Sequence, residues 1–310
     1  AMRRILALAN KSPTRRILQS FSTKPYISGD STHFGFEDVK VEDKERRVRQ
    51  VFENVAESYD VMNDLMSGGL HRLWKDHLLK TSSVSSMAGL VRRHRTSSSQ
   101  QQTTLKILDV AGGTGDIAFR FIEAAGCQER SKSSGEDEVQ VTVCDINPEM
   151  LRVGERRARN KFGSNLIDET KALRFIEGNA QDLRLFQENT FDLYTIAFGL
   201  RNVTDVDKAL REARRVLKPG GRFMCLEFSQ VPNQYFRSIY DYYSFNVIPS
   251  LGQVIANDRS SYQYLVESIR KFSNQDELVA RMERAGMENV KYENLTGGIV
   301  AIHEGWKPLE

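Results

Sequence analysis

Apolar residues along the middle of the chain fall into short runs of strand length, and each run is followed by a stretch with apolar residues at helical spacing. From residue 105 onwards, the runs predict strands at 105–111, 139–146, 173–176, 191–198 and 222–228. The stretches between them predict helices at 116–125, 148–162 and 206–217. Strands that alternate with helices indicate an α/β fold, in which helices cover both faces of a parallel sheet.

The last part of the chain breaks this alternation. Residues 235–272 are rich in aromatic side chains and predict mostly helical structure, and a further helix is expected at 276–285. Two strands then follow closely, at 290–295 and 298–303. They must pair antiparallel, because a parallel crossover needs about a dozen residues or more. A Rossmann-like, seven-stranded sheet with an antiparallel terminal hairpin strand is the arrangement of class I methyltransferases, whereas a dinucleotide dehydrogenase continues with parallel strands.

The first hundred residues divide into three parts by composition. Residues 1–29 contain no acid and carry Arg and Lys among Ser and Thr, which is typical of a mitochondrial transit peptide; a disordered basic tail is the alternative. Residues 41–74 have apolar side chains at helical spacing and predict a helical cap. Residues 81–104 are rich in Ser and Gln and predict a mobile linker or insertion. The expected domains are therefore the transit peptide, an N-terminal cap with its polar linker at 30–104, and a methyltransferase domain at 105–310.

Composition narrows the classes of function. A net charge of +3 is too small to imply a nucleic-acid partner, since part of it belongs to the first thirty residues. No apolar run reaches the roughly 18 residues needed to span a bilayer, so any membrane association is expected to be peripheral. The three cysteines, Cys127, Cys144 and Cys225, are far apart and have no neighbouring histidine at ligand spacing. Neither a structural zinc site nor a disulfide framework is expected, and a reducing compartment fits.

A glycine-rich loop at the end of the first strand carries the strongest signal for a binding site. The segment from Asp109 to Asp116 contains Gly112, Gly113 and Gly115 where the strand gives way to a helix. Glycines let the backbone approach a ligand closely, and free N–H groups at the helix start can meet a carboxylate, such as that of S-adenosylmethionine. Asp109 can order the loop or face the ammonium group of that cofactor. The segment also satisfies the dinucleotide fingerprint G-x-G-x-x-A, so an NAD(P) oxidoreductase is a competing interpretation.

Polar residues at the ends of the next strands favour S-adenosylmethionine. Asp145 ends the second strand, where an acid can accept hydrogen bonds from both ribose hydroxyls. It lies 30 residues after Gly115, and a polar insertion at 128–138 accounts for the excess over the usual spacing of about 20. Asn179 and Ala180 follow the third strand, where a polar side chain and a backbone N–H can read the adenine edge.

With these segments, the sequence resembles the ubiquinone/menaquinone C-methyltransferase family over nearly its whole length after residue 31. The two most specific stretches are Tyr59-Asp60-Val61-Met62-Asn63, continuing to His71 and Trp74, and Arg215-Val216-Leu217-Lys218-Pro219-Gly220-Gly221, continuing to Glu227 and Ser229. The transit peptide and the segment Thr32-His33-Phe34-Gly35 resemble the mitochondrial members. The cofactor contacts of the family correspond here to Thr114, Asp145, Asn179 and Ala180. Some bacterial relatives have serine where this chain has Ala197.

The resemblance implies an activity, a location and partners. The activity would be C-methylation of the ring of a polyprenyl methoxy-benzoquinol in ubiquinone biosynthesis, with S-adenosylmethionine as methyl donor. The location would be the matrix side of the mitochondrial inner membrane, as a peripheral protein within a multi-subunit ubiquinone-biosynthesis complex; a homodimer is left open. A non-catalytic scaffold in such a complex is the second hypothesis, and the intact glycines and Asp145 argue against it.

Methyl transfer to a ring carbon requires activation of the ring, because aromatic carbon is a weak nucleophile until a ring hydroxyl is deprotonated. Arg201 follows the fourth strand, at the rim where ligands bind in open α/β sheets, and could stabilise the phenolate. Asn202 could orient a water, and Tyr59 of the cap could complete the network. The structural alternatives are a salt bridge for Arg201, helix capping for Asn202 and packing within the cap for Tyr59. No metal is needed for this chemistry.

Overall fold

The computed structural model describes residues 31–55, 63–64, 67–89, 104–126, 139–256 and 258–310. Tyr59, Cys127, the predicted transit peptide and the predicted insertion at 128–138 therefore lie outside the described residues. Residues Ser31–Glu310 form one compact unit.

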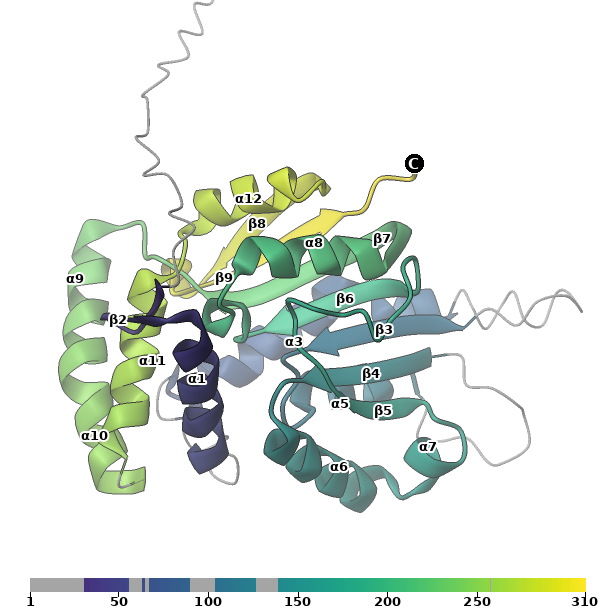
Figure 1. Ribbon diagram of the computed structural model, residues 1–310, viewed down its shortest axis with the longest axis horizontal. Helices are drawn as coiled ribbons and strands as arrows, with labels where there is room; N and C mark the ends of the chain where they lie inside the picture. The colour runs from purple at the N-terminus through teal and green to yellow at the C-terminus, as the bar shows by residue number, and fades with distance from the viewer. Residues whose placement is uncertain (1–30, 56–62, 65–66, 90–103, 127–138, 257) are drawn as a thin grey trace, which may run out of the picture. The chain divides into compact units, whose positions relative to one another are not determined.

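The larger of the two sheets in the described part of the chain has seven strands (Figure 1). They are β3 (Leu105–Val110), β4 (Val139–Asp145), β5 (Leu173–Glu177), β6 (Phe191–Ala197), β7 (Leu217–Phe228), β8 (Glu288–Leu295) and β9 (Val300–Trp306). Their order across the sheet is β5-β4-β3-β6-β7-β9-β8. The strands from β3 to β7 pair parallel, and β9 pairs antiparallel with both β7 and β8. The predicted seven-stranded sheet with an antiparallel terminal hairpin is confirmed.

Helices cover both faces of this sheet, as the alternation of strands and helices predicts. Successive side chains of a strand point to opposite faces, so in β3 Ile107 belongs to one apolar core and Leu108 to the other. The first core contains residues of α3 (Leu70–Ser82), α5 (Asp116–Ala124) and α6 (Pro148–Phe162). The second contains residues of α8 (Val206–Val216) and α12 (Gln275–Arg284). β3 is buried on both faces, and four of its six residues are apolar.

Residues 218–221 differ from their prediction as a turn that precedes a strand. They lie inside β7, where the register with β6 shifts. Gly220 takes a φ of 73°, and its backbone N–H donates to the carbonyl of Lys307 at 2.9 Å. The backbone N–H of Lys307 donates in turn to the carbonyl of Gly221 at 2.9 Å. These bonds to the C-terminal segment keep the irregular stretch within the sheet, and a local Gly-Gly pattern cannot reveal them.

The N-terminal part of the unit begins with a small antiparallel hairpin that the sequence analysis missed. It consists of β1 (Ser31–Phe34) and β2 (Glu37–Lys40), and α1 (Val41–Val55) follows it directly. The aromatic ring of Phe34 stacks on that of Tyr264, with 4.0 Å between the ring centroids. The hairpin is thus held by a contact distant in sequence, which explains why four-residue strands without clear alternation gave no signal.

The predicted linker at 81–104 begins too early. Residues 84–89 are helical, and their apolar side chains Val84 and Ala88 are buried in the first core. Two apolar residues among serines are too few to reveal a helix by periodicity. The remainder of the predicted linker, 90–103, lies outside the described residues.

The predicted helical region near the C-terminus is confirmed as several consecutive helices. These are α9 (Gln234–Tyr242), the π-helix η3 (Tyr243–Val247), α10 (Ile248–Ala256) and α11 (Arg259–Lys271). Large apolar side chains on α9, η3 and α10 remain exposed, and we call them the α9–α10 face: Tyr235, Ile239, Tyr242, Phe245 and Val254. Shorter elements elsewhere are α7 (Asn165–Asp168) and the 3-10 turns η2 (Leu200–Asn202) and η4 (Thr296–Gly298). Among the described helices, none combines the length and the apolar character that crossing a membrane requires.

Candidate active site

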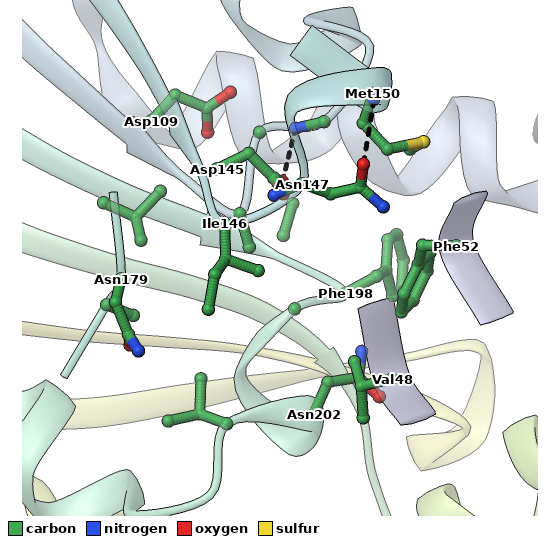
Figure 2. A pocket seen from close by; sticks show the side chains of 18 of the residues that line it. Val48, Phe52, Asp109, Asp145, Ile146, Asn147, Met150, Asn179, Phe198 and Asn202 are labelled. Carbon is green, nitrogen blue, oxygen red and sulfur yellow. Dashed lines mark hydrogen bonds between the residues drawn. The ribbon is translucent and has the colours of Figure 1, made fainter. Parts of the chain in front are cut away.

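A pocket lies at the ends of β3, β4 and β6, where the order of the strands reverses. β3 has β4 on one side and β6 on the other, so the connections after β3 and β6 lead away in opposite directions. Open α/β sheets bind their ligands at such a point. The pocket encloses about 1080 Å³ including its open mouth. Loops after the strands line it, and α1 contributes Val48 and Phe52 to one wall (Figure 2).

The glycine loop after β3 brings the backbone into this pocket. Gly112 and Gly113 line it, as does the buried Thr114. A Cβ on Gly112 would lie 2.8 Å from Oδ2 of Asp109, so a larger residue does not fit there. Gly115 does not line the pocket; it has a φ of 82° and forms the N-cap of α5. Its part in the site is therefore to end the loop, since a left-handed backbone of this kind favours glycine.

Asp145, at the end of β4, is the acid that the sequence analysis assigned to the ribose. Its side chain is buried, and its two oxygens accept backbone hydrogen bonds from Gly113 at 2.9 Å and from Asn147 at 2.8 Å. Burial raises the pKa of Asp145 to about 6. Each carboxylate oxygen can accept a further bond, so the group can hold the glycine loop and still receive the ribose hydroxyls.

Asp109, at the end of β3, is fully buried and lines the same pocket. One of its oxygens accepts a hydrogen bond from the hydroxyl of Thr195 at 2.8 Å. The other oxygen, Oδ2, has no hydrogen-bond partner among the described residues. Burial raises the pKa of this carboxyl to about 7. A buried acid with an unsatisfied oxygen calls for a donor from the ligand, and the α-ammonium group of S-adenosylmethionine is such a donor.

The two raised pKa values predict that cofactor binding weakens in acid. Between pH 8 and pH 6, the affinity for S-adenosylhomocysteine is expected to fall about tenfold, because Asp109 becomes protonated below about pH 7 and then no longer attracts the ligand's ammonium group. Asp145 adds to the loss near pH 6. Calorimetric titration at several pH values measures this. The matched control is Asp109→Asn, which should bind more weakly at pH 8 and respond less to pH. A flat profile for the unaltered protein would contradict the assignment of Asp109.

Asn179 and Ala180 form a third part of the pocket wall, beyond the end of β5. The side-chain oxygen of Asn179 accepts the backbone N–H of Gln181 at 2.9 Å, which fixes the orientation of its amide. Ile146 supplies an apolar surface in the same lining. An amide beside an apolar surface can receive the flat, polar-edged adenine. Thr114, Asp145, Asn179 and Ala180 are thus brought together in one pocket, as the sequence analysis expected.

Of the three predicted catalytic residues, one lines the pocket, one is buried outside its lining and one lies outside the described residues. Asn202 lines the pocket, and its side-chain oxygen accepts a hydrogen bond from the hydroxyl of Tyr264 at 3.0 Å. Arg201 is not among the lining residues; its buried guanidinium pairs with Glu227 at 2.8 Å and also donates to the carbonyl of Phe198. Tyr59 lies outside the described residues. Their catalytic roles remain predictions, and for Arg201 the structure adds a buried ion pair.

Among the lining residues that were not identified from the sequence, three stand out. Phe52 was recognised only as part of the apolar stripe of the cap. Phe198 follows β6 and has a φ of 57°, which is strained for a bulky residue and is found most often at functional sites. Lys75 is 4% exposed and lines the pocket from α3. The available signal was a lysine between Trp74 and Leu78, on the face of the helix that the sequence pattern predicts to be buried. Among the described residues, no group of three or more His, Cys, Asp or Glu side chains could hold a metal ion.

The sequence is similar to known methyltransferases over most of its length. Residues 40–307 match the ubiE/COQ5 methyltransferase family. The mitochondrial 2-methoxy-6-polyprenyl-1,4-benzoquinol methylase of Arabidopsis thaliana is 49% identical over 297 residues, which cover 94% of this chain and 96% of that protein. The protein of the same name from Bos taurus is 50% identical over 299 residues, covering 89% of this chain and 83% of that protein.

A solved structure resembles this chain less closely than those two sequence relatives do. A Haemonchus contortus phosphoethanolamine N-methyltransferase in complex with S-adenosyl-L-methionine is 15% identical, with a TM-score of 0.45, and the match covers 68% of this chain and 50% of that one. Because this identity and this TM-score are low, the family of the chain is assigned from the sequence matches alone. Because the family match spans residues 40–307 and relatives near 50% identity cover almost the whole chain, this protein belongs to the ubiE/COQ5 methyltransferase family.

Proposed function

We propose that this protein transfers the methyl group of S-adenosylmethionine to a ring carbon of a 2-methoxy-6-polyprenyl-1,4-benzoquinol, in the biosynthesis of ubiquinone. The observation that carries the proposal is that relatives of this name, at 49–50% identity, span nearly the whole chain. The acids and glycines at the ends of β3 and β4 support it, because they suit a cofactor with an amino-acid part and a ribose.

The residues of this chain would bind the cofactor and prepare the ring. When bound, S-adenosylmethionine supplies an electrophilic methyl group on a sulfonium. Asp145 would hold its ribose, Asn179 and Ala180 its adenine, and Asp109 its ammonium group. Val48 and Phe52 of α1 would then form an apolar wall for the substrate ring, opposite the loops that carry the cofactor residues. Holding both reactants in one pocket turns a bimolecular step into a positioned one.

Asn202 is the polar residue best placed to act on the ring hydroxyl. Burial raises the pKa of Tyr264, so its hydroxyl stays protonated and donates to the side-chain oxygen of Asn202. That bond leaves the amide nitrogen of Asn202 free to donate to a water or to the ring oxygen. Arg201, held by Glu227 behind the same loop, would contribute positive charge that favours the phenolate.

The proposed activity is tested by methyl transfer to a defined quinol. Purified protein, S-adenosylmethionine and a short-tailed methoxy-benzoquinol, kept reduced, should yield a product with one additional ring methyl group by mass spectrometry. Asp145→Ala serves as the matched control, because it should bind the cofactor weakly and transfer slowly. Cofactor binding without transfer to the quinol would contradict the proposed substrate. Binding of NADH in place of S-adenosylhomocysteine would contradict the proposed reaction class.

We also propose that the protein works in mitochondria, on the matrix face of the inner membrane, within a multi-subunit ubiquinone-biosynthesis complex. The relatives are named mitochondrial, and the acid-free, basic composition of residues 1–29 supports import with removal of that segment. A substrate with a polyprenyl tail resides in lipid, so the enzyme must reach the bilayer surface. The exposed α9–α10 face supports peripheral contact, since its tyrosines and aliphatic residues suit a membrane interface. A homodimer is the alternative occupant of that face.

Charges placed on the α9–α10 face should weaken lipid binding. Ile239 and Val254 are 68% and 82% exposed, so Ile239→Glu with Val254→Glu is not expected to disturb the fold. Losing two inserted side chains, at about 1.5–3 kcal/mol each, should lower partition onto mixed phosphatidylcholine and phosphatidylserine vesicles at least tenfold in co-sedimentation. Leu185→Glu, at an exposed position outside this face, is the control. Unchanged vesicle binding, with loss of a dimer in light scattering, would assign the face to a second copy of the chain.

A further inference from the structure

We propose that Lys75 binds the α-carboxylate of the cofactor's amino-acid part, forming with Asp109 a subsite for an amino-acid zwitterion. The inference rests on the proposed function, because it takes the ligand to be S-adenosylmethionine or its product. The family's cofactor contacts, as they map onto this chain, leave this carboxylate without a charged partner. Thr114, Asp145, Asn179 and Ala180 serve the loop, the ribose and the adenine.

Lys75 is a buried cation in the wall of the pocket. It lies in the middle of α3, is 4% exposed and lines the pocket. Lysine is rarely buried this completely unless it is paired, and burying its charge carries a large desolvation cost. Its ammonium group contacts Oδ2 of Asp116 at 2.7 Å. Among the described residues, this is the hydrogen bond that the ammonium group makes. An ammonium group has three donors, so it can also bind a second anion.

Asp116 explains why a lysine is needed at this position. It stands in the first turn of α5 and also lines the pocket, where the backbone N–H groups and the helix dipole would otherwise attract an anion. Its negative charge opposes a second carboxylate there. Lys75 offsets that charge from the pocket side, and the guanidinium of Arg120 lies 3.4 Å from the other oxygen of Asp116. With Asp116 held by two cations, the end of α5 can accept the ligand's carboxylate.

The pocket's other cation is poorly placed for this role. Of the described residues that line the pocket, only Lys75 and Arg49 carry a positive side chain. The side chain of Arg49 is 40% exposed and pairs with Glu53 on α1 at 3.2 Å, so solvent screens its charge. The side chain of Lys75 is 5% exposed. A charge in so dry an environment interacts more strongly with a ligand.

Lys75 and Asp109 line the same pocket, so they can serve the two charged groups of one amino-acid part. The charges of Lys75 and Asp116 both act on the buried carboxyl of Asp109, the first lowering its pKa and the second raising it, while burial has the largest effect. Asp109 has an unpartnered oxygen and Lys75 has spare donors, and both line the pocket together with Gly112 and Gly113. An α-amino acid carries its ammonium and its carboxylate on one carbon. A cation and an anion in the wall of one pocket match that arrangement.

The position of Lys75 is fixed by its neighbours on α3. Trp74 is buried, donates from Nε1 to the hydroxyl of Thr296 at 2.8 Å, and packs edge-on against Phe228. Leu78, one turn after Trp74, is fully buried in the first core. α3 therefore cannot rotate to take Lys75 out of the pocket without breaking these contacts.

The test compares two ligands that differ in the amino-acid part, whose carboxylate Lys75 would bind and whose ammonium group Asp109 would bind. S-Adenosylhomocysteine carries the amino-acid part, whereas 5′-methylthioadenosine keeps the adenine, the ribose and the thioether but lacks that part. Lys75→Met is expected to lower the affinity for S-adenosylhomocysteine roughly tenfold to a hundredfold in calorimetry, as loss of a charge-assisted hydrogen bond does. Its affinity for 5′-methylthioadenosine should be unchanged. Lys75→Arg should recover part of the loss.

Two controls separate recognition from structure. Arg120→Met removes the other cation near Asp116. Arg120 does not line the pocket, so this variant should change the preference between the two ligands less than Lys75→Met does. Lys75→Met with Asp116→Asn removes both charges of the pair and serves if the single variant fails to fold. It should still show a selective loss, smaller than that of Lys75→Met because the repulsion from Asp116 is removed as well. Equal losses for both ligands, or no loss for either, would overturn the proposal. Because neither titration involves methyl transfer, failure of the quinol assay would leave this result standing.

Discussion

An Arg201→Ala variant is expected to lose about 3–5 kcal/mol of its free energy of unfolding, because it leaves Glu227 buried without its partner. The two side chains are 3% and 1% exposed, so water cannot take the place of the guanidinium. Turnover should fall as well, by roughly a hundredfold, if Arg201 stabilises the phenolate. Urea denaturation measures the first effect, and single-turnover methyl transfer to a short-tailed quinol measures the second.

A double substitution separates these two effects. Arg201→Met with Glu227→Gln removes both charges, and glutamine keeps an oxygen that can accept the backbone N–H of Phe228, as Glu227 does at 2.9 Å. Replacing a buried ion pair by neutral groups of similar volume is often close to neutral for stability. A stable double variant with low turnover and normal cofactor affinity would establish a role in the chemistry. A stable double variant with full turnover would show that Arg201 is structural.

An Asp145→Ala variant is expected to bind S-adenosylmethionine about 2–3 kcal/mol more weakly, which is roughly a 30- to 150-fold loss of affinity. Two hydrogen bonds from the ribose to a charged group would be lost. Part of the loss would come from the glycine loop, because Asp145 accepts the backbone N–H of Gly113. Calorimetric titration gives the affinity, and circular dichroism checks the fold.

Asp145→Asn is the matched control for this prediction. An asparagine keeps one oxygen that can accept the backbone N–H of Gly113 but loses the charge and one acceptor. It should therefore fall between the unaltered protein and the alanine variant. Wild-type affinity in a folded Asp145→Ala variant would remove this residue from the ribose site.

The sheet could be predicted because its signals are local. Four of the six residues of β3 are apolar, since both of its faces are buried. The helix α6 begins at Pro148 as predicted, because the side chain of Asn147 accepts hydrogen bonds from the backbone N–H groups of Glu149 and Met150. The closeness of the last two strands required their antiparallel pairing. That pairing also distinguishes the fold from a dinucleotide dehydrogenase, which the glycine fingerprint alone does not.

The rest depended on contacts between distant parts of the chain. The hairpin β1–β2 is held by the stacking of Phe34 on Tyr264, far along the sequence. The residues of the glycine motif could be placed in the pocket, but the direction of the Arg201 side chain could not, since it follows from a partner 26 residues away, Glu227. Lys75 was missed for the same reason, because its role is visible only where α3 meets the first turn of α5.

The hairpin β1–β2 connects the first described residues of the chain to the active site. If import removes residues 1–29, the processing peptidase cuts almost directly before Ser31, the first residue of β1. A cut only a few residues further along would remove Phe34, whose ring covers Tyr264, the residue that orients Asn202 in the pocket. Slightly excessive trimming would then leave the sheet intact and impair catalysis. The accuracy of cleavage would then decide how active the folded protein is, and wrongly cut molecules would accumulate as folded protein of low activity.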